Sequence, residues 1–246
     1  MSTWVLIRGL TREAGHWGDF PSRLSAHLNC ARVVTVDTPG NGALHKMTSP
    51  TRIADMVTAC RQHLSAQGLP PPYNLLAISL GGMVATEWAY RYPEELRHCI
   101  LISTSFQPFS PFYHRLRPGS WLPLLWGQLC GGRALERTIL NLTSTEHDLT
   151  VLESWTSIRR NHPVGALNAL RQLIAAARFT AQRIKPSIPA LLLAGAGDRL
   201  VDPRCSMVIA AQWGVPIRIH PTAGHDLTLD QPQWVADQIE RWIRPH

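Results

Sequence analysis

The segment of residues 74–85, NLLAISLGGMVA, constrains this chain more than any other. A short apolar run ends at Ser79, which has the small residues Ala77 and Gly81 two positions away on either side. An amphipathic stretch with helical spacing follows at once. This pattern is typical of a nucleophile elbow, in which a strand turns sharply into a helix and presents a serine hydroxyl at the tip. Such a turn brings strand and helix backbones close together and strains the serine, so Ser79 is the candidate nucleophile.

Length and composition set the class of protein. With 246 residues, the chain can bury a substantial core, either as one domain with an insertion or as two domains. It is 45% hydrophobic and 17% charged, which is typical of a globular protein. The formal net charge is +7, but the positive charges are dispersed, and we therefore expect no nucleic-acid partner. The excess of positive charge could serve solubility alone or could favour an acidic partner or substrate.

The cysteines and apolar runs bear on location. The 5 cysteines show neither a CxxC motif nor a paired spacing, which indicates reduced, mostly buried thiols in a cytosolic protein. The chain enters an apolar segment, Trp4–Ile7, without a basic leader and cleavage site. No apolar run approaches the roughly 20 residues that span a bilayer. We therefore predict a cytoplasmic protein without stable membrane insertion.

Short β-rich runs alternate with helical stretches, which favours parallel strands joined by crossover helices. The predicted strands are Trp4–Ile7, Ala31–Val36, Leu75–Ile78, Cys99–Ser103, Ala190–Ala194 and Ile217–His220. The predicted helices among them are Phe20–Leu28, a helix capped by Ser49 or Thr51 that ends near Gln67, Leu80–Tyr92 and Gln233–Ile243. A mostly parallel α/β sheet flanked by helices is therefore expected.

The pattern changes between residues 104 and 189, where no strand is predicted. The helices expected there are Trp121–Leu129, Arg133–Leu142, Leu149–Arg160 and Pro163–Phe179. Two buried strands separated by a long helical stretch indicate an insertion that lies over the sheet. We therefore predict a core of residues 1–104 and 190–246 and a helical cap of residues 105–189.

Two polar residues after later strands complete a candidate catalytic set. Asp198 follows an apolar strand, and His225 follows the next short strand. Asp202 is a competing acid, although Asp202-Pro203 is also typical of a helix start. Taken singly, Ser79 could cap a helix, Asp198 could cap a turn and His225 could be an ordinary loop histidine. Together they supply a nucleophile, a base and an acid.

Five motifs, in this order, resemble the α/β-hydrolase family, in particular its capped, carboxylesterase-like branch. They are Arg8-Gly9-Leu10 before Trp17, Asp37-x-Pro-Gly-x-Gly42, Ala77-x-Ser79-x-Gly81-Gly82, Gly197-Asp198-x-x-Val201 and Gly224-His225. The Ser-Asp-His order is also the chain order of this family. The resemblance implies the α/β-hydrolase fold with a helical cap inserted after a central strand. It also implies an oxyanion hole made by the backbone N–H groups of Leu10 and Leu80.

The chemistry requires these residue types. A serine hydroxyl is a weak nucleophile at neutral pH, so His225 must take its proton. Asp198 would hold the imidazole in the correct tautomer. We expect cleavage of carboxylic esters through an acyl-serine intermediate, without a cofactor or metal. The same triad could hydrolyse carbon–carbon bonds or perform an elimination of the menaquinone-pathway type, and a receptor on this fold is a further alternative.

Two positions depart from the usual motifs of the family. Ala77 stands where glycine is commoner, and its single methyl group is expected to fit. Arg8 stands where a histidine usually precedes the glycine of the oxyanion loop. We predict that Glu13 pairs with Arg8 and braces the loop.

The predicted cap carries candidates for substrate binding. Trp121, Trp126 and Trp155 are expected to line an acyl pocket or, alternatively, to pack within the cap. The segment Ser120–Trp126 is apolar enough to face a substrate tunnel or a lipid surface.

Arginines on the predicted cap helices suggest a partner. Arg133 and Arg137 lie four residues apart on one helix, and Arg159-Arg160 lie on another. They could bind acyl carrier protein or a phosphate-bearing acyl group, because the branch that this chain resembles includes methyl ester esterases acting on pimeloyl groups attached to that carrier. Ordinary solvent-facing arginines are the alternative.

Overall fold

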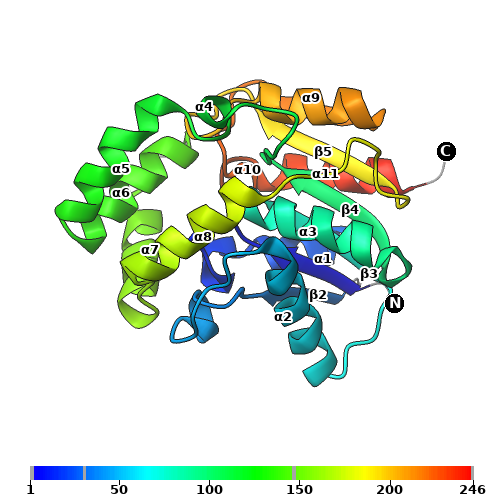
Figure 1. The fold of residues 1–246 in the computed structure, drawn as a ribbon, viewed down its shortest axis with the longest axis horizontal. Coiled ribbons are helices and arrows are strands. Elements are labelled where there is room, and N and C mark those ends of the chain that lie inside the picture. The colour runs from blue at the N-terminus through cyan, green and yellow to red at the C-terminus, as the bar shows by residue number, and fades with distance from the viewer. Residues whose placement is uncertain (1–2, 30–31, 146–147, 245–246) are drawn as a thin grey trace.

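A six-stranded sheet of parallel strands lies at the centre of the computed structural model, which describes residues 3–29, 32–145 and 148–244 (Figure 1). The strands are β1 (Thr3–Ile7), β2 (Arg32–Val36), β3 (Tyr73–Ile78), β4 (Leu96–Ile102), β5 (Ala190–Gly195) and β6 (Ile217–His220). Their spatial order is β2-β1-β3-β4-β5-β6, and every adjacent pair is parallel. Parallel neighbours require crossover connections, which place helices on both faces of the sheet.

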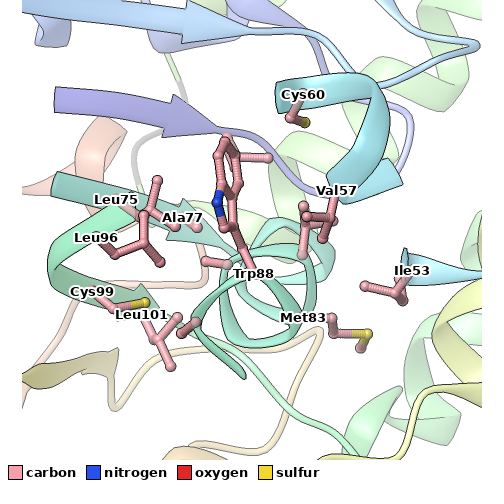
Figure 2. Close-up of a cluster of buried hydrophobic side chains, with 14 of the residues drawn as sticks. Ile53, Val57, Cys60, Leu75, Ala77, Met83, Trp88, Leu96, Cys99 and Leu101 are labelled. Atoms are coloured by element: carbon pink, nitrogen blue, oxygen red, sulfur yellow. The ribbon is translucent and has the colours of Figure 1, made fainter. Parts of the chain in front are cut away.

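Each face of the sheet has its own hydrophobic core. On one face, α2 (Ile53–Ala66), α3 (Leu80–Arg91) and α9 (Arg204–Trp213) pack against alternate strand residues, with Trp88 at the centre of the cluster in Figure 2. On the other face, α1 (Phe20–His27) and α11 (Pro232–Ile243) cover the remaining strand residues. Because successive strand side chains point to opposite faces, strands buried on both faces consist of continuous apolar runs. The predicted α/β fold is confirmed.

Among the described residues, five α-helices separate β4 from β5, and they lie beyond the carboxyl ends of the strands (Figure 1). They are α4 (Phe112–Arg115), α5 (Trp121–Leu129), α6 (Gly132–Thr143), α7 (Leu149–Asn161) and α8 (Ala166–Arg178). We call residues 105–189 the helical insertion. Its division from the core at those residues stays a prediction. One further short helix, α10 (Leu227–Asp230), precedes α11.

Some boundaries differ from the predictions. β4 begins at Leu96 rather than Cys99, and Ala31, the predicted start of β2, lies outside the described residues. The predicted cap of α2 is wrong: Arg52 is the N-cap residue, without a side-chain cap bond. The Ser49 hydroxyl instead donates to the Pro39 carbonyl oxygen at 2.9 Å, because the loop before α2 packs against the helical insertion.

The described cysteines are free thiols. Cys60, Cys99 and Cys205 are buried, whereas Cys130 is exposed on the helical insertion and Cys30 lies outside the described residues. Burial raises the pKa of Cys60 and of Cys99 to about 12. These two thiols are therefore protonated packing residues near neutral pH. Among the helices that the structure describes, none is long and apolar enough to cross a membrane.

Candidate active site

Ser79 lies at the tip of a strained turn between β3 and α3. Its backbone has φ 57° and ψ −118°, a region that residues other than glycine rarely occupy. Its N–H donates to the Ile102 carbonyl oxygen, and its own carbonyl oxygen accepts from the Gly82 N–H and the Thr104 hydroxyl, each at 2.9 Å. Three hydrogen bonds therefore hold a conformation that the backbone alone disfavours.

Two glycines after the serine allow α3 to approach the neighbouring segments. A Cβ atom on Gly81 would lie 2.4 Å from the Ile7 carbonyl oxygen and 2.7 Å from the Arg8 carbonyl oxygen. A Cβ atom on Gly82 would lie 2.5 Å from the Thr104 hydroxyl oxygen. Both contacts are closer than any side chain tolerates, so the Ser-x-Gly-Gly sequence is required by packing. Ala77, on the other flank, is fully buried in the core cluster, where its methyl group fits.

Asp198 and His225 are joined by a buried hydrogen bond. The Nδ1 atom of His225 lies 2.7 Å from Oδ2 of Asp198, and both side chains are buried. The second carboxylate oxygen, Oδ1, accepts from the backbone N–H groups of Leu200 and Val201 at 2.8 Å each. These bonds fix the carboxylate, which in turn fixes the imidazole ring.

Asp202, the competing acid, belongs to a helix start. Its carboxylate accepts from the Arg204 backbone N–H at 2.9 Å and pairs with the Arg204 guanidinium at 2.6 Å. The hydrogen bonds and charge of Arg204 lower the pKa of Asp202 to about 2. Asp202 therefore holds the beginning of α9, and Asp198 is the acid that contacts the histidine.

Ser79 and His225 line the same cavity. Among the hydrogen bonds of the described residues, none joins Ser79 Oγ to His225 Nε2. Catalytic hydrogen bonds are often long before substrate binds, so shared access to one cavity is the relevant geometric condition. The structure thus links Asp198 to His225 directly and places Ser79 in the wall of the same chamber.

The two predicted oxyanion donors also reach this cavity. Leu10 and Leu80 both line it. Leu80 is the first residue of α3, and the first N–H groups of a helix have no acceptor within the helix. The Leu10 N–H likewise has no acceptor within the part of the chain that the structure describes. The positive end of the α3 dipole adds a favourable field for an anion at this point.

Arg8 pairs with Asp226, which corrects the predicted pairing with Glu13. The Nη1 and Nη2 atoms of Arg8 lie 3.2 and 2.5 Å from the two carboxylate oxygens of Asp226, with both side chains buried. Glu13 instead lies 2.9 Å from Nδ1 of His162. Asp226 follows His225 in a loop that lies beside the segment after β1. A buried guanidinium needs a buried carboxylate, and Asp226 supplies one to Arg8. The pair ties the loop of the proposed oxyanion donor to the loop of the proposed base.

The charge on Asp226 is stabilised by this pairing. Burial alone would raise the pKa of Asp226, but the Arg8 guanidinium and the hydrogen bond from the Thr228 hydroxyl bring that pKa below its ordinary value. The side chain is therefore ionised at neutral pH and faces the Arg8 charge. From the sequence, Asp226 is expected to point away from the site or to cap a turn. The only signal for its pairing was the arginine at position 8, which requires an acid somewhere in the fold.

The cavity has a volume of about 530 Å³ and lies between the core and the helical insertion. Its wall is mainly apolar, and Trp121 and Trp155 contribute to it. Their role in binding an acyl chain stays a prediction. Trp126 does not line the cavity; this side chain is 69% exposed, which corrects the prediction. The reason is the rotation of α5: Leu124 faces the cavity, and residues two apart on a helix point in different directions.

The segment Ser120–Trp126 divides between the cavity and the exposed surface; whether it faces substrate or lipid stays a prediction. Trp121 and Leu124 line the cavity, while Leu122, Leu125 and Trp126 are exposed to solvent.

The four arginines that were predicted to meet an acidic partner comprise three exposed residues and one partly buried residue, Arg159. Arg133 pairs with Glu153 on the surface, and Arg137 and Arg160 are also exposed. Arg159 instead binds Glu136 at 2.5 Å.

Glu136 is 1% exposed at its side chain and also accepts from Arg12 at 2.6 Å. The Arg12 guanidinium carbon lies 4.5 Å from the centre of the Trp155 ring. Of the four arginines predicted to meet an acidic partner, three are thus accessible, and Arg159 is part of a buried ion network that joins the insertion to the core.

Comparison with known proteins agrees with this architecture. The pimeloyl-[acyl-carrier protein] methyl ester esterase of Yersinia enterocolitica is 26% identical over 93% of this chain and 92% of its own length. The protein of the same name from Aeromonas salmonicida is 29% identical over 83% of this chain and 80% of its own length. A thermophilic esterase from Thermogutta terrifontis has the same fold, with a TM-score of 0.77 over 99% of this chain and 90% of that chain at 21% identity. Residues 4–238 match the alpha/beta hydrolase family, and this chain belongs to that family.

Proposed function

We propose that this protein is a serine hydrolase that cleaves carboxylic esters of small or medium acyl chain through an acyl-serine intermediate. The observation that carries the proposal is the buried 2.7 Å bond between His225 and Asp198 at the wall of a cavity that also contains the strained Ser79. A serine on an ordinary turn would need neither the strain nor the oriented imidazole. The named activity of the relatives supports ester hydrolysis.

The geometry suggests how the reaction runs. The Ser79 hydroxyl oxygen attacks the ester carbonyl carbon while His225 Nε2 takes the hydroxyl proton. The carbonyl oxygen gains negative charge and accepts hydrogen bonds from the Leu10 and Leu80 N–H groups. His225 then gives its proton to the leaving alkoxide, and an alcohol departs. Water repeats the attack on the acyl-serine, with His225 as base, and releases the carboxylic acid and the free serine. Asp198 stabilises the imidazolium in both half-reactions.

The substrate class follows from the cavity and from the insertion above it. We propose that residues 105–189 act as a cap whose apolar inner wall, with Trp121 and Trp155, receives the acyl chain. Two observations support a carrier-bound substrate. Relatives with that named activity align over most of this chain, and Arg133, Arg137 and Arg160 are exposed at the surface, where they are accessible to an acidic partner. A cytoplasmic location belongs to the same proposal and is supported by the free thiols.

A labelling experiment tests the mechanism. A fluorophosphonate probe should label the protein rapidly, and Ser79→Ala should abolish both labelling and the turnover of a p-nitrophenyl ester series. A burst of nitrophenol equal to the enzyme concentration would support the acyl-serine route. Turnover that survives in Ser79→Ala would refute the proposal. Labelling without turnover of any ester would favour the elimination or receptor alternatives.

A second experiment tests the carrier. The double variant Arg133→Ala, Arg137→Ala should raise KM for an acyl methyl ester attached to acyl carrier protein and leave the kinetics for a p-nitrophenyl ester unchanged. Added salt should weaken only the first reaction. Equal kinetics on both substrates at all salt concentrations would remove the carrier from the proposal.

A further inference from the structure

Gln172 is a fully buried glutamine on α8, at 0% exposure, whose amide is completely hydrogen-bonded. Its Nε2 donates to Oδ1 of Asn41 and to the Ser49 hydroxyl oxygen, each at 3.0 Å. Its Oε1 accepts the Thr11 backbone N–H at 2.8 Å. Glutamine is usually exposed, and its burial is tolerated only when every polar atom is paired. The insertion has thus placed a polar side chain between the loop after β2 and the loop after β1.

Thr11 follows the proposed oxyanion donor directly. The Arg12 N–H donates to the Gly9 carbonyl oxygen at 3.2 Å, so Leu10 and Thr11 are the central residues of a tight turn. Thr11 has φ 55°, whereas Leu10 is not among the residues with positive φ, as in a type II turn. The third position of that turn favours glycine or asparagine. A β-branched threonine there is strained and needs support from its surroundings.

The support comes from Gln172. A type I turn would give Thr11 an ordinary negative φ and would rotate the peptide between Leu10 and Thr11 by about half a turn. That rotation would take the Thr11 N–H away from the Gln172 acceptor. The hydrogen bond therefore favours the strained form of the turn. It fixes the peptide between Leu10 and Thr11, which directly follows the peptide that carries the Leu10 N–H, and so it limits the movement of that N–H.

We propose that Gln172 is a positioning residue for the oxyanion hole: through the Thr11 N–H, it holds the loop that presents the Leu10 N–H to the developing oxyanion. This inference rests on the proposed function. It gives the helical insertion a part in stabilising the transition state, besides covering the cavity. Displacement of α8 from the core would release the turn, so full activity requires the docked insertion.

Asn168, on the same helix, offers a matched control. Its Oδ1 accepts the Ser49 N–H and its Nδ2 donates to the Met47 carbonyl oxygen, both at 2.9 Å. Asn168 thus joins α8 to the loop after β2, much as Gln172 does, but within the described part of the chain it makes no hydrogen bond to the turn of residues 9–12. If Gln172 had a purely structural role, substitution of Gln172 and substitution of Asn168 should have similar effects on activity.

The test compares Gln172→Met with Asn168→Leu on p-nitrophenyl butyrate. We expect Gln172→Met to lower kcat about 10- to 100-fold, less than the about 100- to 1000-fold loss of an entire oxyanion donor, with KM changed less than about threefold. Binding of a trifluoromethyl ketone transition-state analogue should weaken by the same factor as kcat/KM. Asn168→Leu should keep kcat within about threefold, at a similar loss of melting temperature.

A rescue distinguishes positioning from damage. Glycine adopts positive φ at no steric cost, so Thr11→Gly added to Gln172→Met should restore kcat at least about fivefold. If Gln172→Met does not fold, Gln172→Asn withdraws the acceptor while keeping a polar amide, and the same loss of kcat is expected.

Equal effects of the Gln172 and Asn168 variants, or a failed rescue, would overturn the positioning role. Activity that survives Ser79→Ala would instead overturn the proposed function. Wild-type turnover that depends on Ser79 but is matched by Gln172→Met would overturn the positioning role alone.

Discussion

The sheet and the helical insertion are held in place by different forces. Around the sheet, two large apolar clusters pack on opposite faces, and the side chains of β1, β3 and β5 are almost all buried. The insertion shares some apolar packing with the core through Phe106 and Phe179. Its own cluster, around Leu140, Leu152 and Trp155, is small, and the insertion exposes several large apolar side chains.

Hydrogen bonds and ion pairs, which we call polar links, also join the insertion to the core. Glu136 binds Arg12, Gln172 binds Thr11 and Asn168 binds Ser49. Hydrogen bonds and ion pairs are directional, whereas apolar burial is not. The core thus gains most of its stability from area removed from water. The insertion gains defined contacts around the cavity, where the orientation of each group matters for catalysis. Stability and activity should therefore respond differently to substitutions in the two regions.

The largest expected effect on stability is in the core. Trp88 is fully buried between α3 and the sheet (Figure 2). Its indole N–H donates to Glu95 at 2.8 Å. We expect Trp88→Ala to lower the free energy of unfolding by about 3–5 kcal/mol, because a cavity replaces a large side chain. Trp126→Ala is the control on the exposed face of α5 and should change it by less than about 0.5 kcal/mol. Urea titration measures both, and equal losses would refute the contrast between the two regions.

A smaller, regional effect is expected at the ion network of the insertion. Glu136→Gln removes the charge that compensates Arg12 and Arg159 and should cost roughly 2–4 kcal/mol, somewhat less than complete removal of a buried partner because the amide keeps one acceptor. We expect faster hydrogen exchange and proteolysis within residues 105–189, with little change in strands β1 to β5. Leu140→Ala provides a comparison that loosens the same region without changing charge. Exchange that rises uniformly over both regions would show that the two unfold as one unit.

The same contrast explains what could be predicted from the sequence. Strands buried on both faces consist of apolar runs, so β1 and β5 could be located almost to the residue. The nucleophile elbow could also be located, because the backbones of β3 and α3 approach neighbouring segments closely. This approach requires small residues at fixed distances in sequence from Ser79. Asp198 and His225 were identified as candidates by their positions after strands. Their roles stay predictions until activity is measured.

The polar links could not be predicted because they join distant parts of the chain. Arg8 and Asp226 are 218 residues apart, and Thr11 and Gln172 are 161 apart. No local pattern specifies such a pair, and the nearer Glu13 was a reasonable but wrong partner for Arg8. Trp126 failed for another reason: α5 is apolar on nearly all sides, so its sequence does not indicate which face turns toward the cavity.

The smallest expected effect concerns the polar link within the core. The pKa of Asp226 is lower in the folded state than its ordinary value near 3.9, so its ionised form stabilises the fold above that pH. This contribution is complete near neutral pH and is lost as pH falls through the folded pKa. Asp226→Asn should therefore lower the free energy of unfolding by about 1–3 kcal/mol at pH 6, because Arg8 keeps only a neutral partner.

The difference in free energy of unfolding between the wild type and Asp226→Asn should become smaller as the pH falls toward 3. Protonation of Asp226 then removes from the wild type the ion pair that the variant lacks at every pH. Denaturant unfolding at pH 6, 4.5 and 3 measures this change. Glu153→Gln, at an exposed ion pair of the insertion, is the control and should show little difference at any of these pH values, because exposed pairs are weak. A gap for Asp226→Asn that stays constant or widens on acidification would mean that its charge does not stabilise the loop of His225. Arg8 would then be held mainly by packing against Trp17, whose ring centre lies 4.8 Å from the guanidinium carbon.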